Sequence, residues 1–408
     1  MRVGIVGGSI AGCSAGILLL KEGHDVSIFE RSSSNLVGRG GGIGTTSEMI
    51  DEIRKAGLID DDFACFDINQ MPFIGKSKDA EPFGKQAWSL SMDFKVFHWN
   101  ELWTNLRRKL PNSMYHQGVM ITHACHLPNG TVQITTSDGD NYTFDLVLFA
   151  DGYNSLGRKL LYPEKELTYR GYILWRGLLD ETAIQDNCEL KDEILRLSYK
   201  DAPGHNVVYF IPSKDGSTQP GKRIFNWAAY IAIEEEKLDE VMTDQDGNLW
   251  EGTLPPGKLS PGVEAELKTR LSKEMPSFYA KVINRTPNSY IQVIYTLDLD
   301  QYGKKNVGLI GDAGTVVQPF TGSGVFKGYH NVKDLIAKIR DHSNLTDALM
   351  AWDIDQVERG KRLLVLGEQM EKAFIWDAID FSKATAKFME QWWKESVTFP
   401  EDFNYQRK

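Results

Sequence analysis

The sequence predicts an α/β protein, α+β overall, in which a parallel sheet is joined to a mostly antiparallel sheet and to a helical C-terminus. Three observations carry this prediction. Residues 2–31 run as apolar strand, glycine-rich turn, helix and strand, a βαβ order that implies parallel strands. Residues 169–233 hold alternating strands rich in Trp and Tyr. From residue 345 onward, apolar and aromatic residues follow a helical pattern.

Length, charge and cysteines limit the classes of function. The 408 residues are enough for two domains, and 41% hydrophobic with 25% charged residues is ordinary globular composition. A net charge of −10 argues against a nucleic-acid partner. The four cysteines show neither C-x-x-C spacing nor a His at metal-ligand spacing, which indicates thiols in a reducing compartment and no metal site. Five glycines in residues 3–20 indicate strand, turn and helix, and not a membrane span. We expect a cytoplasmic protein without a membrane partner.

The first elements follow from local signals. The strand "RVGIVGG" leads into a helix that ends at Gly23, a plausible C-cap, and "HDVSIFER" is the second strand. The segment "TSEMIDEIRKAGLID" has apolar residues at helical spacing behind a Thr/Ser cap. A further helix, "NELWTNLRRKLP", is expected to start at the capping residue Asn100 and to stop at Pro111.

The middle of the chain reads mainly as strands. Residues 119–150 contain strands joined by N-G and D-G turns. The antiparallel region runs through "YRGYILWRGLLD", "NVVYFIPS" and "RIFNWAAYIAI". The polar segment 234–260, with its Pro and Gly, predicts an excursion loop. "NVGLIGD" is a buried strand before a glycine-rich loop and a helix.

The N-terminal unit predicts a dinucleotide site of the Rossmann type. Gly7 allows a tight turn after the strand, and Gly12 lets the helix pack closely on the sheet. The helix N-terminus then offers N–H groups to a pyrophosphate. Glu30 ends the second strand and is able to accept both ribose hydroxyls. The middle position of G-x-G-x-x-G is Ser9, which is small enough for the turn and adds a hydroxyl.

Two later strand ends carry similar signals. One buried strand ends in Asp151-Gly152, followed by Ser155 and Arg158; the alternative reading is a capped turn with Arg158 on a helix surface. The other strand ends at Asp312, which precedes a loop whose glycines allow the backbone to approach a flat ring.

In this order, the three motifs resemble the class A flavoprotein aromatic hydroxylases, which have the p-hydroxybenzoate hydroxylase fold. The likeness covers nearly the whole chain. Within that family, scattered segments are similar to the branch that hydroxylates dihydroxypyridines: "GGSIAG", "GRGGGI", "WNELW", "YRGYILWRG", "NWAAY", "VMTDQDGN" and "LPPG". Two positions depart from the common family pattern: Thr315 stands where many members have His, and Trp99 where many have Arg.

The resemblance implies non-covalent FAD, NADH or NADPH as co-substrate, and hydroxylation of an electron-rich aromatic or N-heteroaromatic ring by O2 through a flavin C4a-hydroperoxide. It places Arg39 near flavin and pyridine nucleotide, and Asp151 and Gly152 in the motif linked to both nucleotides. The remaining expected FAD contacts are Gly7, Ser9, Ile10, Ala11, Gly12, Glu30, Arg31, Asp312, Pro319, Gly322, Ser323, Gly324 and Val325.

The expected domains are discontinuous. Residues 1–70, 96–168 and 301–344 would form the FAD-binding domain, and 71–95 with 169–300 the substrate-binding domain. Residues 345–408 would form a helical region whose apolar faces fit either packing on the FAD domain or a homodimer surface.

Several residues of the antiparallel region are candidates for contact with the substrate. Tyr209, Asn226, Trp227 and Tyr230 are candidates, and each also reads as ordinary core. Arg176 would bind an anionic ring or form a structural ion pair, and Tyr209, Asn226 and Arg176 are the catalytic candidates. His98 and His205 are more typical of exposed or hydrogen-bonded histidines than of catalytic ones, and no general base is assigned. An FAD-linked reductase or dehydrogenase, or a non-catalytic flavin-binding scaffold, remains the alternative.

Overall fold

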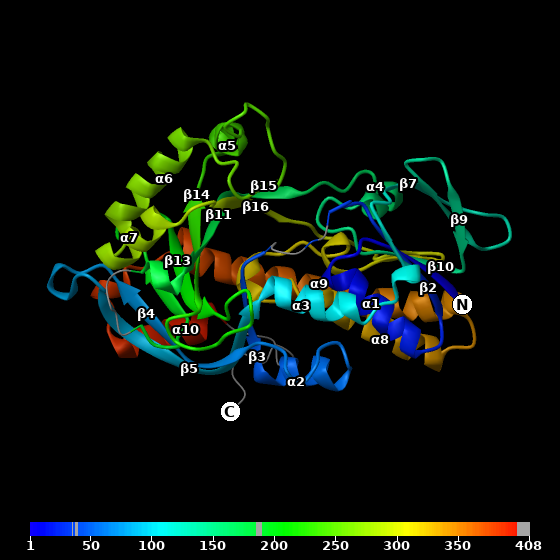
Figure 1. Ribbon diagram of the computed structural model, residues 1–408, viewed down its shortest axis with the longest axis horizontal. Helices are drawn as coiled ribbons and strands as arrows, with labels where there is room; N and C mark the ends of the chain where they lie inside the picture. Colours follow the sequence, from blue (N-terminus) through cyan, green and yellow to red (C-terminus); the bar gives the residue numbers. More distant parts are fainter. Residues whose placement is uncertain (35, 37–39, 185–189, 398–408) are drawn as a thin grey trace.

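The computed structural model describes residues 1–34, 36, 40–184 and 190–397. Two large sheets lie side by side along the long axis of the molecule (Figure 1). One has six strands, the other nine, and a separate three-stranded sheet covers one end. Parallel and antiparallel sheets joined by helices confirm the predicted fold class.

The six-stranded sheet holds the predicted βαβ unit. Five of its strands are parallel, and only the edge strand β17 runs the other way. The four-residue stretch Leu146–Phe149 is buried at every position, as expected for a central parallel strand. In spatial order the strands are β17 (Gly303–Lys304), β18 (Val307–Leu309), β10 (Leu146–Phe149), β1 (Arg2–Val6), β2 (Asp25–Glu30) and β6 (Tyr115–Gln117).

Helices α1 (Ile10–Lys21), α3 (Trp99–Arg108) and α8 (Lys327–Asp341) pack beside this sheet (Figure 1). Helix α1 contacts both α3 and α8. The expected cap of α3 at Asn100 is wrong: the helix begins one residue earlier, and the His98 ring accepts the Asn100 N–H at 3.0 Å. A short helix α4 (Leu156–Leu161) follows β10, and β7 (Ile121–His126), β8 (Val132–Thr136) and β9 (Asn141–Phe144) form the small sheet.

The nine-stranded sheet gathers strands from three distant parts of the chain. Its strands in order are β15 (Thr253–Leu254), β16 (Tyr290–Thr296), β11 (Thr168–Asp180), β14 (Ile224–Ala232), β13 (Gly204–Ile211), β12 (Leu195–Ser198), β4 (Phe66–Gly75), β5 (Lys85–His98) and β3 (Gly42–Thr46). All pairings except β12 with β4 are antiparallel. Strands of 71–95 thus share a sheet with those of 169–296, while the predicted domain boundaries stay a prediction.

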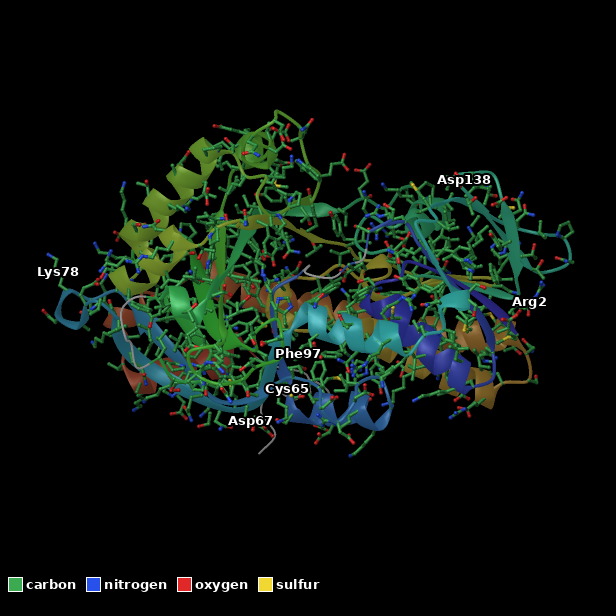
Figure 2. The ribbon with its side chains drawn as sticks, viewed as in Figure 1. Arg2, Cys65, Asp67, Lys78, Phe97 and Asp138 are labelled. Atoms are coloured by element: carbon green, nitrogen blue, oxygen red, sulfur yellow. The ribbon has the colours of Figure 1, made fainter. Side chains whose placement is uncertain are left out.

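Each face of this sheet has its own cover. Helices α6 (Pro261–Glu274) and α7 (Ser277–Arg285) pack on one face, with Trp175 and Trp227 in their core. The other face, here called the inner face, carries Tyr172 and Tyr230 and packs against α9 (Leu345–Glu371) and α10 (Ala386–Ser396). Phe97, on β5 near the middle of the molecule (Figure 2), packs instead in the core of the six-stranded sheet. The inner face is therefore the surface that a ligand between the sheets would meet.

Two further expectations meet the structure. Helix α2 (Ser47–Lys55) is capped by Thr46, whose hydroxyl accepts the Met49 N–H at 3.2 Å. The expected loop 234–260 is partly wrong, because α5 (Glu235–Met242) lies within it. Among the described residues, no helix is both long and apolar enough to span a membrane.

Candidate active site

The turn from β1 into α1 requires glycine at both predicted positions. Gly7 has φ of +104°, and a Cβ there would lie 2.4 Å from the Ala150 carbonyl oxygen. A Cβ on Gly12 would lie 1.8 Å from the Gly7 carbonyl oxygen. Both contacts are with backbone, which cannot move aside as a flexible side chain can. The first turn of α1 is thus seated on the strand end.

The N-terminus of α1 has the geometry of an anion cradle. Its N-cap is Ser9, whose side chain makes no capping hydrogen bond, so the first-turn N–H groups beside Ile10 and Ala11 are not capped by it. Loop and helix backbone close in on the same place: a Cβ on Gly328 would lie 2.5 Å from Ala11 Cβ, and one on Gly311 3.1 Å from it. The residues present therefore fit a pyrophosphate at this helix end.

Glu30 lies at the end of β2 and is buried. Its Oε2 accepts the Gly8 N–H at 2.8 Å, and its Oε1 accepts the Ser32 N–H at 2.8 Å. Each carboxylate oxygen has room for a second donor, so ribose hydroxyls still fit. The neighbouring Arg31 is exposed, and Arg39 lies outside the described residues.

The Asp151-Gly152 turn follows β10 on the same edge of the sheet. Asp151 Oδ2 accepts the Leu156 N–H at 2.7 Å, while Oδ1 is buried and has no partner among the described residues. Burial raises the pKa of Asp151 above its ordinary value, although the Ser155 hydroxyl and the Leu156 N–H act in the other direction. Gly152 has φ of +83°, so its conformation is the reason for glycine there. A buried carboxylate oxygen without a donor fits a ligand hydroxyl.

Arg158 corrects a sequence expectation. The surface-helix reading is wrong, because Arg158 is 2% exposed. Its guanidinium donates to the carbonyl oxygens of Ala313 at 3.1 Å and Asp312 at 3.4 Å, and also to that of Tyr153. It thus ties the Asp151 turn to the Asp312 turn.

Lys327, which the sequence analysis missed, holds Asp312. Its ammonium lies 2.5 Å from Asp312 Oδ1 and donates to the Thr315 carbonyl oxygen. Lys327 is the first residue of α8 and is buried. A cation is unfavourable at a helix N-terminus unless an anion is near, and that conflict was the available sequence signal. Asp312 remains 44% exposed, which leaves it accessible to a ligand hydroxyl.

The loop before α8 carries the remaining predicted contacts. Pro319 opens a short 3-10 turn, and Gly322 after it has φ of +65°. The Ser323 and Thr321 hydroxyls lie 2.8 Å apart, Gly324 is exposed with open space around it, and Val325 is half-buried. A cavity of about 460 Å³ borders Gly322 and Ser323, between this loop, α2 and α9.

The two departures from the family pattern have local explanations. The Trp99 backbone N–H donates to the Gly41 carbonyl oxygen at 3.0 Å, and Gly40 packs on the Trp99 side chain. Thr315 is buried, and its hydroxyl bonds the Tyr302 hydroxyl.

On the inner face, Arg176 and Asn226 hold the backbone of one residue, Gly42, from both sides. The Arg176 guanidinium donates to the Gly42 carbonyl oxygen at 3.0 Å, and Asn226 Oδ1 accepts the Gly42 N–H at 2.8 Å. Tyr209 lies directly opposite Asn226 on β13, and Tyr290 lies opposite Arg176 on β16. The structure brings the three predicted catalytic candidates together and adds Tyr290.

This cluster leaves three buried polar groups unused. Arg176 Nε, Asn226 Nδ2 and the Tyr290 hydroxyl have no hydrogen-bond partner among the described residues. A Cβ built on Gly41 would lie within 3.1 Å of Arg176 Nη2, Asn226 Oδ1 and the Tyr290 hydroxyl, so the three side chains that carry these groups meet beside Gly41. None of the carboxylates that the structure describes pairs with Arg176, whose other hydrogen bond reaches Gln292 at 3.5 Å. The structure therefore does not give Arg176 the alternative role of an ion-pair partner.

Other predicted substrate residues divide between the two faces. Trp227 points away from the cluster: its indole N–H donates to the Thr286 hydroxyl at 2.9 Å, and it packs on Trp175. The prediction that Trp227 contacts the substrate is therefore wrong. Tyr230 stays on the inner face, stacked on His205 at 4.6 Å. Burial raises the pKa of Tyr230 to about 12 and also raises that of Tyr209, so both remain protonated phenols.

His98 and His205 are both buried and neutral. Burial lowers the pKa of His98 to about 4, with Lys214 and Arg176 adding to the effect. Burial, with Arg196 adding to it, holds the pKa of His205 well below its ordinary value. Neither therefore supplies a proton-accepting base that titrates near neutral pH.

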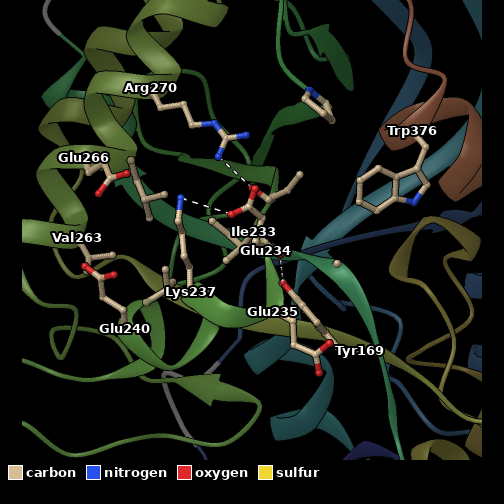
Figure 3. A pocket seen from close by; sticks show the side chains of 15 residues that line it. Tyr169, Ile233, Glu234, Glu235, Lys237, Glu240, Val263, Glu266, Arg270 and Trp376 are labelled. Atoms are coloured by element: carbon tan, nitrogen blue, oxygen red, sulfur yellow. Dashed lines mark hydrogen bonds and ion pairs between the residues drawn. The ribbon is translucent and has the colours of Figure 1, made fainter.

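A second cavity, of about 720 Å³, lies away from these residues. Figure 3 shows Glu234, Glu235, Glu240 and Glu266 on its walls, with Trp376 on the far side. None of its lining residues belongs to the predicted site.

The chain is similar in sequence to known FAD-binding and monooxygenase proteins. A family model described as FAD binding domain-like matches residues 169–296. The 2,6-dihydroxypyridine 3-monooxygenase of Paenarthrobacter nicotinovorans is 27% identical over 365 residues, covering 89% of both chains. The 3-amino-4-hydroxybenzoate 2-monooxygenase of Streptomyces cremeus is 26% identical and covers 53% of this chain and 55% of its own.

Solved structures match over almost the whole chain. The 2,6-dihydroxypyridine-3-hydroxylase of Arthrobacter nicotinovorans has a TM-score of 0.81 at 22% identity, covering 100% of this chain and 98% of its own. Klebsiella pneumoniae HpxO, complexed with FAD and uric acid, has a TM-score of 0.73 at 17% identity, covering 97% and 92%. These matches confirm the resemblance seen in the sequence. The chain is a flavoprotein monooxygenase with the fold of the FAD-dependent aromatic hydroxylases.

Proposed function

We propose that this enzyme hydroxylates an electron-rich aromatic or N-heteroaromatic ring of the hydroxypyridine class, which it binds as an anion at Arg176. The carrying observation is the set of unused groups on Arg176, Asn226 and Tyr290. All three carry N–H or O–H hydrogens, so they suit a ligand that accepts hydrogen bonds. Arg176 adds a half-buried positive charge that no described carboxylate balances, and a deprotonated hydroxyl would supply that balance.

The chain's own residues fit FAD at the edge of the six-stranded sheet. We assign the pyrophosphate to the N-terminus of α1 and the ribose to Glu30. Asp312 and the loop 319–325 would hold the ribityl chain and the flavin ring. When bound and reduced by NAD(P)H, FAD supplies the activation of O2 that transfers one oxygen atom to the ring.

The protein contributes charge, orientation and exclusion of water. Arg176 favours the deprotonated substrate, which raises the electron density of the ring that must accept an electrophilic oxygen. Tyr172, Tyr230 and Phe320 form an aromatic wall, with Phe320 packed 4.6 Å from Tyr230 and 6.1 Å from Tyr172. Such a wall keeps water from the reacting ring.

We predict that the substrate, and no enzyme side chain, sets the acid limb of the pH profile. Burial lowers the pKa of His98 to about 4, holds the pKa of His205 well below its ordinary value, and raises the pKa of Tyr230 to about 12. Between about pH 6 and about pH 9, kcat/KM should therefore rise to a plateau as the substrate hydroxyl ionises. Measured on substrates of different acidity, the limb should move with each substrate's pKa. A limb fixed at one pH for all of them would show an enzyme base.

The decisive experiment is a flavin-reduction and oxygen-transfer screen. The purified enzyme is mixed with NADH or NADPH and a panel of hydroxylated pyridines, purines and benzoates, under O2 labelled with heavy oxygen. We expect at least one hydroxypyridine to accelerate flavin reduction and to appear with one labelled oxygen atom. Turnover without O2 would instead favour a dehydrogenase. A panel in which no ring compound changes the reduction rate would reject the proposed substrate class.

Two further proposals concern the location of the enzyme and its oligomeric state. We propose a cytoplasmic location from the cysteine usage and a homodimer from α9, where Met350, Ile354 and Val365 are more than half exposed. Sedimentation of the full chain tests the dimer. A single species with the mass of one chain at micromolar concentration would exclude it.

A further inference from the structure

One buried carboxylate on α9 joins the sheet to the loop before α8. Glu371, at the end of α9, is 3% exposed and lies in none of the sites predicted from sequence. Its Oε2 accepts the Tyr172 hydroxyl at 3.2 Å and the Gln318 side-chain N–H at 2.8 Å. Its Oε1 accepts the Arg170 guanidinium at 2.7 Å and the Trp376 indole N–H at 3.1 Å. A single side chain thus binds strand β11, the loop and the C-terminal segment.

All four partners of Glu371 are donors, and this fixes its chemistry. A carboxylate has two oxygens that accept, whereas a glutamine amide would turn an NH₂ group toward one pair of donors. Burial acts to raise the pKa of Glu371, but the hydrogen bonds from Arg170, Gln318 and Trp376 outweigh it and lower the pKa. The group is therefore an anion at neutral pH, and a neutral isostere cannot replace it.

Gln318 carries the effect of Glu371 into the loop. It is fully buried and directly precedes Pro319. Its amide is wedged against α9, because a Cβ on Gly367 would lie 2.1 Å from its Oε1. The backbone carbonyl oxygen of Gln318 accepts the Thr321 hydroxyl at 3.1 Å. Phe320 packs on Tyr172 and Tyr230 of the inner face. Moving Gln318 would move the turn that bears Phe320 and Gly322.

We propose that Glu371 is a positioning residue for oxygen transfer, which acts through Gln318 to fix the loop 319–324 against the inner face. This inference rests on the proposed function, since it needs the flavin and the substrate to meet at that loop. Displacement of reacting groups by about 1 Å costs on the order of a hundredfold in rate. A shifted loop would let the reduced enzyme pass electrons from NAD(P)H to O2, releasing hydrogen peroxide in place of hydroxylated product.

The test compares Glu371→Gln with Glu368→Gln. Glu368 lies one turn earlier on α9, is 57% exposed, and also faces Arg170, at 3.9 Å, but none of its contacts among the described residues reaches the loop. We expect the fraction of NAD(P)H oxidised to hydrogen peroxide, in saturating substrate, to rise on the order of tenfold in E371Q and to stay at the wild-type value in E368Q. The visible flavin spectrum and the FAD dissociation constant should shift in E371Q alone.

Gln318→Met provides a second route if E371Q folds poorly. It removes the amide but keeps the length of the side chain, and it should reproduce the uncoupling and the spectral shift. The double variant should be no worse than the more affected single variant, because both act on one contact. A lower melting temperature with unchanged spectrum, FAD affinity and coupling in E371Q and Q318M would overturn the inference. A wild-type enzyme that hydroxylates no ring compound would instead reject the proposed function.

Discussion

Gly12→Ala should yield colourless protein. Even a single methyl group would lie 1.8 Å from the Gly7 carbonyl oxygen, so α1 must move away from the end of β1. Overpacking costs about 1–3 kcal/mol of stability, with the upper end where backbone cannot yield. The shift would also carry the first-turn N–H groups away from the pyrophosphate. Losing about 3 kcal/mol of those contacts would weaken FAD binding about a hundredfold. The measurement is the ratio of flavin absorbance to protein after purification, with FAD titration of the apoprotein. Gly12→Val should be at least as severe.

A matched control lies one turn further along α1. A Cβ on Gly16 would lie 2.6 Å from Ile28 Cδ1, which is the far end of a flexible side chain. Gly16→Ala should therefore lower the melting temperature and keep the yellow colour. The clash at Gly12 is with the backbone of the strand turn, and the phosphate site is lost as a consequence. Fully yellow Gly12→Ala protein would place the FAD elsewhere.

Sequence reasoning succeeded where the signal is local. The glycines at 7 and 12 and the strand-ending Glu30 lie within 30 residues of one another, and their backbone demands can be read from spacing alone. The alternation along β11 likewise puts Arg176 on the same face as Tyr172, since the two lie an even number of residues apart in the strand. These features belong to turns and strands whose geometry depends on neighbours in the chain.

It failed where a residue's partner is distant or the phase of a strand is ambiguous. Arg158 bonds a carbonyl oxygen 155 positions away, which the alternative of a surface-helix residue missed. Glu371, which the sequence analysis did not single out, bonds Arg170 at a separation of 201. Asn226 and Trp227 are adjacent in a strand and must face opposite sides, yet both were candidates for one site. An apolar strand buried on both faces gives no pattern that selects between them.

The missed helix α5 has a similar cause. Residues 235–242 are mostly charged, and only Val241 and Met242 of them are buried. The segment therefore lacks the apolar stripe from which a helix is predicted. Its acidic first turn, Glu235 and Glu236, was the one usable signal, since negative charge favours a helix N-terminus.

Arg176→Met should raise the KM for the hydroxylated ring by about ten- to a hundredfold while the protein stays yellow. A hydrogen bond to a charged group is worth about 1.5–3 kcal/mol, and each 1.4 kcal/mol is about tenfold in affinity. Methionine keeps an unbranched apolar stem in the cluster, is shorter than arginine, and removes the charge and every donor. Without the guanidinium, the bound substrate hydroxyl should also ionise at higher pH, because the cation that favours its anion is gone.

Two variants separate substrate recognition from support of the Gly42 peptide. Arg176→Lys keeps the charge but not the planar fork, so it should recover part of the affinity and the lower pH limb. Arg270→Met removes an arginine from the second cavity, where it donates to the Ala232 carbonyl oxygen at 3.0 Å, and it should leave KM unchanged. If Arg176 only clamps Gly42, Arg176→Met will release flavin, and the fraction that retains flavin will bind substrate as the wild type does. If it holds the substrate anion, flavin content will persist, and both KM and the pH limb will move together.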